Sequence, residues 1–151
     1  MKRFLLPLVV VLLTITSSCS NDDSSDSQNQ DFFAKVDGEK FYEDTRTITI
    51  DGEGDEMYAH IYVNNTEDEY FHFWLKADLA EGTYDVVNDV EDGILMSLYT
   101  EDNFHNTEGV LEIASNENGV IEGNFHFTAT HSVFETERNV TEGNFSFDLN
   151  Q

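Results

Sequence analysis

The chain has 151 residues, which is enough for one domain and too few for two. It carries 31 acidic side chains against 7 Lys and Arg, and this acidity disfavours both nucleic acid phosphates and anionic lipid headgroups as partners. High negative charge alone would be typical of a disordered chain, but 12 Phe, 6 Tyr and one Trp provide ample apolar surface. We therefore expect a folded domain with an acidic surface.

The N-terminus has the layout of a secretory signal peptide. Lys2 and Arg3 give a positive start, residues 4–15 are mostly apolar, and small residues precede Cys19. The apolar stretch is too short to cross a bilayer core of about 30 Å as a helix. Its ending resembles the lipobox of bacterial lipoproteins, which implies that residues 1–18 are cleaved and that Cys19 is acylated and anchors the protein in a membrane. An ordinary signal peptide with a chance cysteine is the alternative.

Residues 19–30 form the next predicted unit, the lipidated cysteine and an acidic, disordered tether. Residues 20–30 contain no apolar side chain, and eleven such residues have a root-mean-square reach of roughly 20 Å. Asp22 and Asp23 resemble the export signal that sends Bacteroidetes lipoproteins to the outer face of the outer membrane. We expect surface exposure, with a periplasm-facing anchor as the alternative. Cleavage would leave five basic and 31 acidic side chains, a formal charge of −26.

Residues 31–151 carry the patterning of antiparallel β-structure. No proline follows Pro7, apolar residues alternate with polar ones, and turn signals recur about every ten residues. The Asp37-Gly38 and Asn118-Gly119 pairs accept the positive φ angles of tight hairpin turns. We predict an all-β fold, a single antiparallel β-sandwich or barrel-like domain of about ten short strands. The expected strands are 32–36, 39–43, 45–50, 57–64, 70–77, 83–87, 94–100, 110–114, 120–130 and 140–149.

Two segments of the chain echo each other at a spacing of 20 residues. Glu-Gly-Asn-Phe-His-Phe occupies 122–127, and Glu-Gly-Asn-Phe-Ser-Phe occupies 142–147. In a strand, the two Phe of each segment share one face, while Asn124, His126 and Ser146 share the other. The glycine before each Phe pair predicts a bulge or a close backbone approach. We interpret the echo as two neighbouring strands that fill one core.

The order of these motifs resembles that of a known family. The chain has an FxAKVDGxxF opening at 32–41, a Gly-Thr-Tyr at 82–84 and a Gly-x-Leu-x-Ile at 109–113. A Gly-x-Phe-x-Phe then occurs at 123–127 and again at 143–147. This sequence of motifs behind a lipobox resembles a family of Bacteroidetes lipoproteins with a domain of unknown function. The resemblance covers nearly all of residues 31–151, and it implies an architecture and a location but no activity and no functional residues.

The best candidate site follows from the alternation in two consecutive strands. Within 57–63 and 70–77, one face is apolar and core-like. The opposite face is aromatic, and if the strands pair as a hairpin its side chains form one hydrogen-bonding patch. Such a patch suits a glycan, a peptide or a protein ligand, whereas burial of both faces would make it a second core layer. The predicted ligand-binding residues are Tyr58, His60, Tyr62, Tyr70, His72 and Trp74, with Lys76 beside them.

The sequence predicts no cofactor and no metal site. The acidic turns at 51–56, 67–69, 89–92 and 101–103 offer oxygen ligands of the kind that Ca²⁺ prefers, but none has the twelve-residue EF-hand pattern. Calcium binding by these turns stays open. The five histidines, His60, His72, His105, His126 and His131, show no recognised metal-ligand spacing.

Catalysis has little support, because the chain contains no nucleophile motif and no phosphate-binding glycine loop. We predict that the protein is not an enzyme but a non-catalytic binding or accessory module on a membrane surface. A structural envelope-coat protein without a specific ligand is the alternative, and a small hydrolase is a weaker one. The sequence leaves the ligand and the oligomeric state open.

Overall fold

The computed structural model describes residues 31–66, 69–86, 94–100, 104–131 and 133–151. The predicted signal peptide, the lipidated Cys19 and the tether lie outside these residues. The same is true of the acidic turns at 89–92 and 101–103.

Ten strands and one short 3-10 turn make up the described part of the chain. None of the described residues forms a helix long and apolar enough to cross a membrane. The elements are β1 (Phe32–Val36), β2 (Glu39–Phe41), β3 (Thr45–Asp51), η1 (Gly54–Glu56), β4 (Tyr58–Thr66), β5 (Glu69–Lys76), β6 (Gly82–Val86), β7 (Ile94–Tyr99), β8 (Phe104–Glu117), β9 (Val120–His131) and β10 (Glu137–Asp148).

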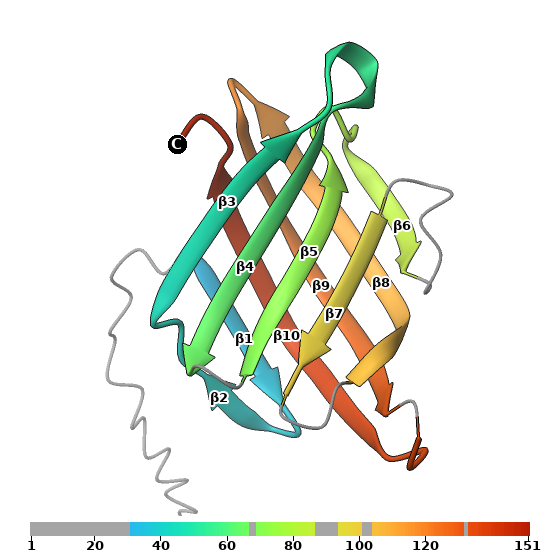
Figure 1. Ribbon diagram of the computed structural model, residues 1–151. Helices are drawn as coiled ribbons and strands as arrows, with labels where there is room; N and C mark the ends of the chain where they lie inside the picture. The colour runs from blue at the N-terminus through green and yellow to red at the C-terminus, as the bar shows by residue number, and fades with distance from the viewer. Residues whose placement is uncertain (1–30, 67–68, 87–93, 101–103, 132) are drawn as a thin grey trace, which may run out of the picture.

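The strands form two antiparallel sheets that pack face to face (Figure 1). One sheet has six strands in the order β2-β1-β10-β9-β8-β6, and the other has four in the order β3-β4-β5-β7. Among the described residues, no strand pairing joins the two sheets into a closed barrel. The predicted all-β fold is confirmed, and of the two architectures left open it is the sandwich.

The hairpin turns predicted from Asp-Gly and Asn-Gly pairs are confirmed. Asp37 and Gly38 have φ angles of 52° and 86°, and Asn118 and Gly119 have φ angles of 55° and 80°. These turns join β1 to β2 and β8 to β9. Glycine, which lacks a Cβ atom, and the short polar side chains of Asp and Asn reach this backbone conformation at low cost, and its twist matches that of the flanking strands.

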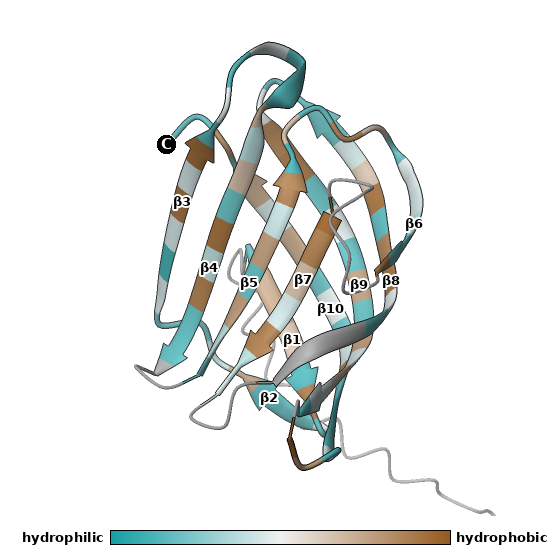
Figure 2. Cartoon of the chain, turned by 45° about the vertical axis from the view of Figure 1, so that its right-hand side comes forward, coloured by the Kyte–Doolittle hydropathy of each residue, from teal (hydrophilic) through white to brown (hydrophobic). Residues whose placement is uncertain are grey.

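The core between the sheets is rich in phenylalanine, which supplies eight of the 24 buried hydrophobic residues that the structure describes. Hydrophobic and hydrophilic bands alternate along the strands (Figure 2). The buried side chains of both sheets are almost all hydrophobic. Phe73 of the four-stranded sheet contacts Phe125 and Phe147 of the six-stranded sheet, with ring centroids 5.3 and 5.5 Å apart. Phe71 contacts Phe32 of β1 at 5.3 Å. Because aromatic rings bury large apolar areas, these contacts hold the two sheets together.

The two echoing segments lie on β9 and β10, and their glycines and phenylalanines pair reciprocally. Gly143 lies directly across from Phe125, and Gly123 lies across from Phe145. A Cβ atom on Gly143 would come within 2.6 Å of the Phe125 ring, and one on Gly123 within 2.8 Å of the Phe145 ring. Each phenylalanine ring therefore covers the backbone of the opposite glycine, which confirms the predicted close approach.

We predict that Gly143→Ala destabilises the fold by about 1–3 kcal/mol, because the Phe125 ring must move to admit the methyl group. The nearest atoms to that methyl all belong to this one ring. In a Phe125→Leu background the cost of Gly143→Ala should therefore fall, and urea unfolding of the four proteins in the double-mutant cycle measures the coupling. Equal cost in both backgrounds would show that the ring does not require the glycine.

Candidate functional site

The predicted aromatic patch lies on the outer face of the four-stranded sheet. In β5, Phe71, Phe73 and Leu75 point into the core, so the residues between them point outward. β4 and β5 pair as the predicted hairpin. The cross-strand pairs on the outer face are Tyr58 with Lys76, His60 with Trp74, Tyr62 with His72, and Asn64 with Tyr70.

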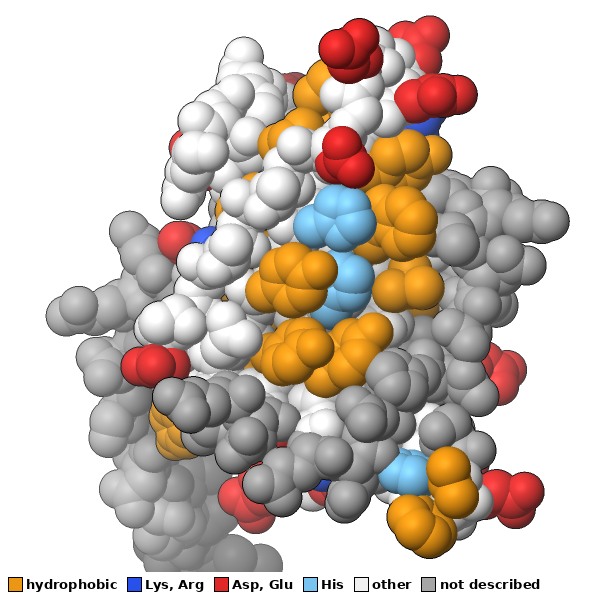
Figure 3. Space-filling view, viewed as in Figure 1, with side chains coloured by type: hydrophobic (Ala, Val, Ile, Leu, Met, Phe, Trp, Pro, Cys, Tyr) orange, Lys and Arg blue, Asp and Glu red, His pale blue; other side chains and the backbone are white. Residues whose placement is uncertain are grey.

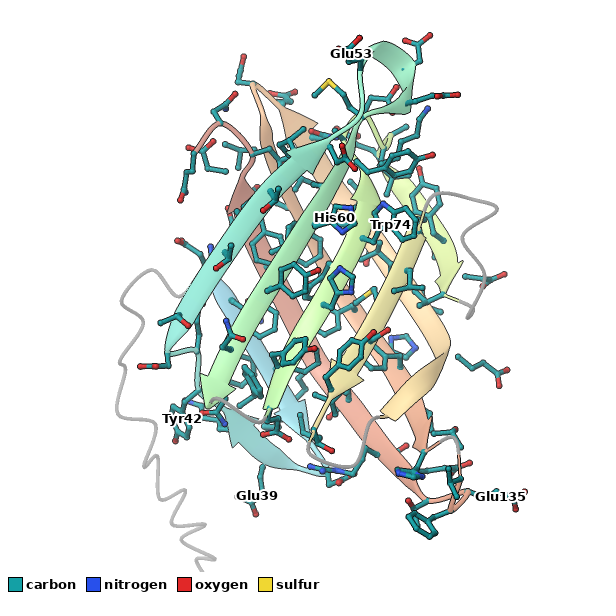
Figure 4. All side chains as sticks on the ribbon, in the orientation of Figure 1. Glu39, Tyr42, Glu53, His60, Trp74 and Glu135 are labelled. Atoms are coloured by element: carbon teal, nitrogen blue, oxygen red, sulfur yellow. The ribbon has the colours of Figure 1, made fainter. Side chains whose placement is uncertain are left out.

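The outward rings form one continuous array, which we call the aromatic ladder and which consists of Tyr58, His60, Tyr62, Tyr70, His72, Trp74 and Tyr99. Its rings contact one another across the strands, mostly with parallel planes. The interplanar angle is 2° between Tyr62 and His72, whose centroids lie 4.4 Å apart. His60 stacks on Trp74 at 5.3 Å and 18°, and the two side chains lie side by side over β4 and β5 (Figure 4).

Tyr99 is the member of the ladder that sequence reasoning missed. Its ring stacks on Tyr70 with centroids 4.8 Å apart and an interplanar angle of 11°. It comes from β7, which pairs with β5 although β6 lies between them in the chain. The alternation in residues 94–100 would have placed Tyr99 on the face of Leu95 and Ser97, but nothing local to that strand indicates which strand it pairs with.

The ladder is a face without charge on a strongly acidic protein. Its six predicted residues are all half-buried, so the rings are accessible without being fully exposed. Among the described residues of β3, β4, β5 and β7, charged side chains that point outward occur only in the cross-strand row at one end, where Asp51, Tyr58 and Lys76 lie side by side. The space-filling view shows the histidines and aromatic rings grouped in the middle of the face, with acidic side chains around its margin (Figure 3).

The two histidines at the centre of the ladder contact each other. His72 Nε2 and His60 Nδ1 lie 3.4 Å apart, so one ring can donate to the other according to its tautomer. Burial lowers the pKa of His72 to about 4 from an ordinary value of 6.5, and the neighbouring His60 contributes in the same direction. At neutral pH, His72 is therefore uncharged.

The tyrosine end of the ladder is likewise neutral. Burial raises the pKa of Tyr70, and the nearby Tyr99 and Tyr62 hydroxyls raise it further. At the other end, the Trp74 indole N–H is buried and makes no hydrogen bond in the structure. An unpaired buried donor of this kind costs about 1–3 kcal/mol, so Trp74 is held here by its ring contacts and not by its polar atom.

The stacking decides which parts of the rings a ligand would meet. Because the rings of Tyr62 and His72, and those of Tyr70 and Tyr99, lie face to face, much of their π surface is already covered by a neighbour. What remains is largely ring edges with the tyrosine hydroxyl groups, because the Trp74 N–H is buried and the nearest nitrogens of His60 and His72 contact each other. The face therefore offers apolar edges and hydrogen-bonding groups, and less of the flat open ring surface on which a sugar stacks.

The other histidines do not join the ladder. His126 points outward from the opposite sheet, and His131 is buried at the β9–β10 turn, where its Nδ1 accepts hydrogen bonds from the N–H groups of Val133 and Phe134. The side chain of His105 lies outside the described residues. Among the described residues no group of three or more His, Cys, Asp or Glu is placed to hold a metal ion.

Comparisons with known proteins gave no match to a family model, to a curated protein or to a solved structure. The resemblance to Bacteroidetes lipoproteins therefore stays a prediction from the motifs.

We predict that His72 makes stability depend on pH. Because its pKa is lower in the folded protein than in the unfolded chain, the unfolded chain binds the proton preferentially. The free energy of unfolding should therefore fall as pH drops from about 6.5 towards about 4. Urea unfolding of the wild type and of His72→Gln across this range measures the free energy of unfolding at each pH. The difference between the two proteins reports His72 alone, because both carry the same carboxylates.

The matched control for this experiment is His126→Gln, which removes an exposed imidazole from the opposite sheet. This variant should keep the pH dependence of the wild type. If the free energy of unfolding of His72→Gln depends on pH as that of the wild type does, the lowered pKa of His72 is contradicted.

Proposed function

We propose that the protein is a lipid-anchored, non-catalytic binding module on the outer surface of a membrane, and that the aromatic ladder docks a polypeptide. The observation that carries the proposal is the absence of charge from the centre of this face. The whole chain has a formal charge of −24, yet the outward positions between the ends of β3, β4, β5 and β7 carry none. Depletion of charge and enrichment in Tyr and Trp are typical of the centre of a protein interface.

The orientation of the rings supports a polypeptide over a sugar. Stacked ring edges with hydroxyl groups fit apolar side chains and the polar backbone of a peptide. Thr45, Thr47 and Thr49 on the neighbouring β3 extend the face with further hydroxyl groups, and they pair with Asn64, Tyr62 and His60. The acidic margin of the face favours a partner whose own surface is neutral or basic around the contact.

The proposed anchor is the lipid on Cys19, joined to the domain by the tether of residues 20–30. More than one acyl chain is needed for stable anchoring, at about 0.8 kcal/mol per buried CH₂. The acidic residues after the cysteine support export to the cell surface. An anchored head on a short tether presents the ladder close to the membrane, where it would meet neighbouring proteins of the envelope.

For the anchor, we predict that Cys19→Ser releases the protein from membranes into the soluble fraction. Cell fractionation followed by immunoblotting measures the distribution, and mass spectrometry of the wild type identifies the acylated N-terminal cysteine. Membrane retention of Cys19→Ser, or an unmodified sulfur in the wild type, would contradict the anchor.

For the ladder, we predict that Thr47→Glu weakens peptide binding at least tenfold. Thr47 is exposed and pairs with Tyr62, so a glutamate there places a charge beside the ladder without removing any ring. The probe is a displayed library of random dodecapeptides, selected on the full chain in detergent micelles. Affinities of the selected peptides for wild type and variant are then measured by titration.

The matched control is Thr136→Glu, an exposed threonine at the β9–β10 turn, which should bind the selected peptides as the wild type does. Trp74→Ala, which removes a ring from the ladder, should also lose binding. The proposal that the ladder docks a polypeptide is contradicted if Thr47→Glu binds the selected peptides as tightly as the wild type does. It is also contradicted if Thr47→Glu and Thr136→Glu lose the same affinity.

A further inference from the structure

The outer face of the six-stranded sheet is hollowed into a second potential site, unrelated to the aromatic ladder. A groove of about 610 Å³ crosses β8, β9 and β10 and reaches Thr83 on β6. This volume lies within the range of about 300–1,000 Å³ found for small-ligand sites. Because the groove and the ladder lie on opposite outer faces of the sandwich, their ligands would not compete.

Three cross-strand rows of polar side chains line the groove. The first row is Glu112, Asn124 and Asn144, and the third is Glu108, Thr128 and Asn139. His126 and Val110 form the row between them. With a rise of about 3.3 Å per residue, the first and third rows are about 13 Å apart along β9, which is longer than one sugar ring.

The middle row is completed by a bulge in β10. Two residues of β10, Thr141 and Glu142, lie opposite the single His126, because the pairing shifts between Val140 and Gly143. Glu142 has a φ of 52°, a left-handed conformation that costs energy for a residue with a side chain. An ion pair with Lys35 of β1, 2.8 Å between nitrogen and oxygen, accompanies this conformation. Bulges of this kind occur often beside binding sites, where they redirect a side chain.

The groups in the groove match a ligand rich in hydroxyl groups. Asparagine amides both donate and accept hydrogen bonds, carboxylates accept, and threonine hydroxyls do both, as sugar hydroxyls also do. Within the described residues, the side chains of Asn124, Asn144 and Glu112 make no hydrogen bond or ion pair, so their polar atoms are available to a ligand. We propose that this groove binds a neutral glycan.

The charged side chains around the groove determine which kinds of glycan it would accept. Glu108 and Glu112 face the groove, and Lys35 beside it already pairs with Glu142. Lys40 lies across from Lys35 but on β2, which β1 separates from the groove strands. Acidic sugars and phosphorylated ligands would therefore be repelled. A basic peptide could pair with the two glutamates but would leave the amides, the hydroxyls and His126 without a specific role, so the lining favours the glycan.

The test is a glycan array that carries neutral, amine-bearing and acidic oligosaccharides, together with immobilised oligolysine. It is probed with the full chain in detergent micelles. The wild type should be retained by neutral oligosaccharides. Asn124→Ala/Asn144→Ala, which removes two exposed neighbouring amides, should lose at least tenfold in affinity for them. Glu112→Gln, which keeps the shape of the side chain, is the second variant and should lose affinity several-fold.

Two controls separate this proposal from that of the ladder. Thr47→Glu should bind glycans as the wild type does, even where it loses peptide binding. Glu122→Gln alters the same outer face outside the groove, where Glu122 accepts hydrogen bonds from Ser115 and Ser146, and it should also bind normally. The proposal is overturned if no neutral oligosaccharide is retained, if both groove variants bind as the wild type does, or if only amine-bearing sugars and oligolysine are retained.

Discussion

Phenylalanine rings from the two sheets interlock and hold the sandwich together. Phe71 and Phe73 of β5 are fully buried and insert among rings from β1, β9 and β10. No disulfide can form within the chain, since Cys19 is its only cysteine. Stability therefore comes from burial of apolar surface, and eight of the 24 buried hydrophobic residues in the described part of the chain are phenylalanines.

This core also determines which residues face water. Because successive side chains in a strand point to opposite faces, His72 between Phe71 and Phe73 must point outward, and so must His126 between Phe125 and Phe127. A slip of one residue in register would expose the phenylalanines and bury the ladder. The same packing that stabilises the sandwich thus presents two chemically different outer faces, one aromatic and uncharged, the other lined by amides and carboxylates.

Much of the fold could be predicted from local patterns. The Asp37-Gly38 and Asn118-Gly119 turns have one favoured geometry, and strict alternation in β4 and β5 determined which of their residues share a face. The six predicted site residues lie together because β4 and β5, which are consecutive in the chain, pair with each other.

The rest depends on pairing between strands that are distant in the chain. Tyr99 joins the ladder only because β6 pairs with β8 in the other sheet, which leaves β7 free to pair with β5. The groove is formed by residues of β8, β9 and β10, which lie side by side, and by the bulge at Glu142. Gly123 and Gly143 predicted a bulge or a close backbone approach, and the structure has both. Their pairing with Phe145 and Phe125 depends on the register between β9 and β10, which the local sequence does not determine.

Hydroxyl-radical footprinting tests whether the aromatic ladder is a docking face. The purified full chain and intact cells that carry the protein are labelled in parallel, and oxidation of Tyr62, Tyr70 and Trp74 is compared with that of Tyr42. Tyr42 is 60% exposed and lies away from the ladder, so it reports general access. We expect the ladder to be labelled in the purified chain and selectively protected on cells. Equal labelling of the ladder in both samples would contradict the claim.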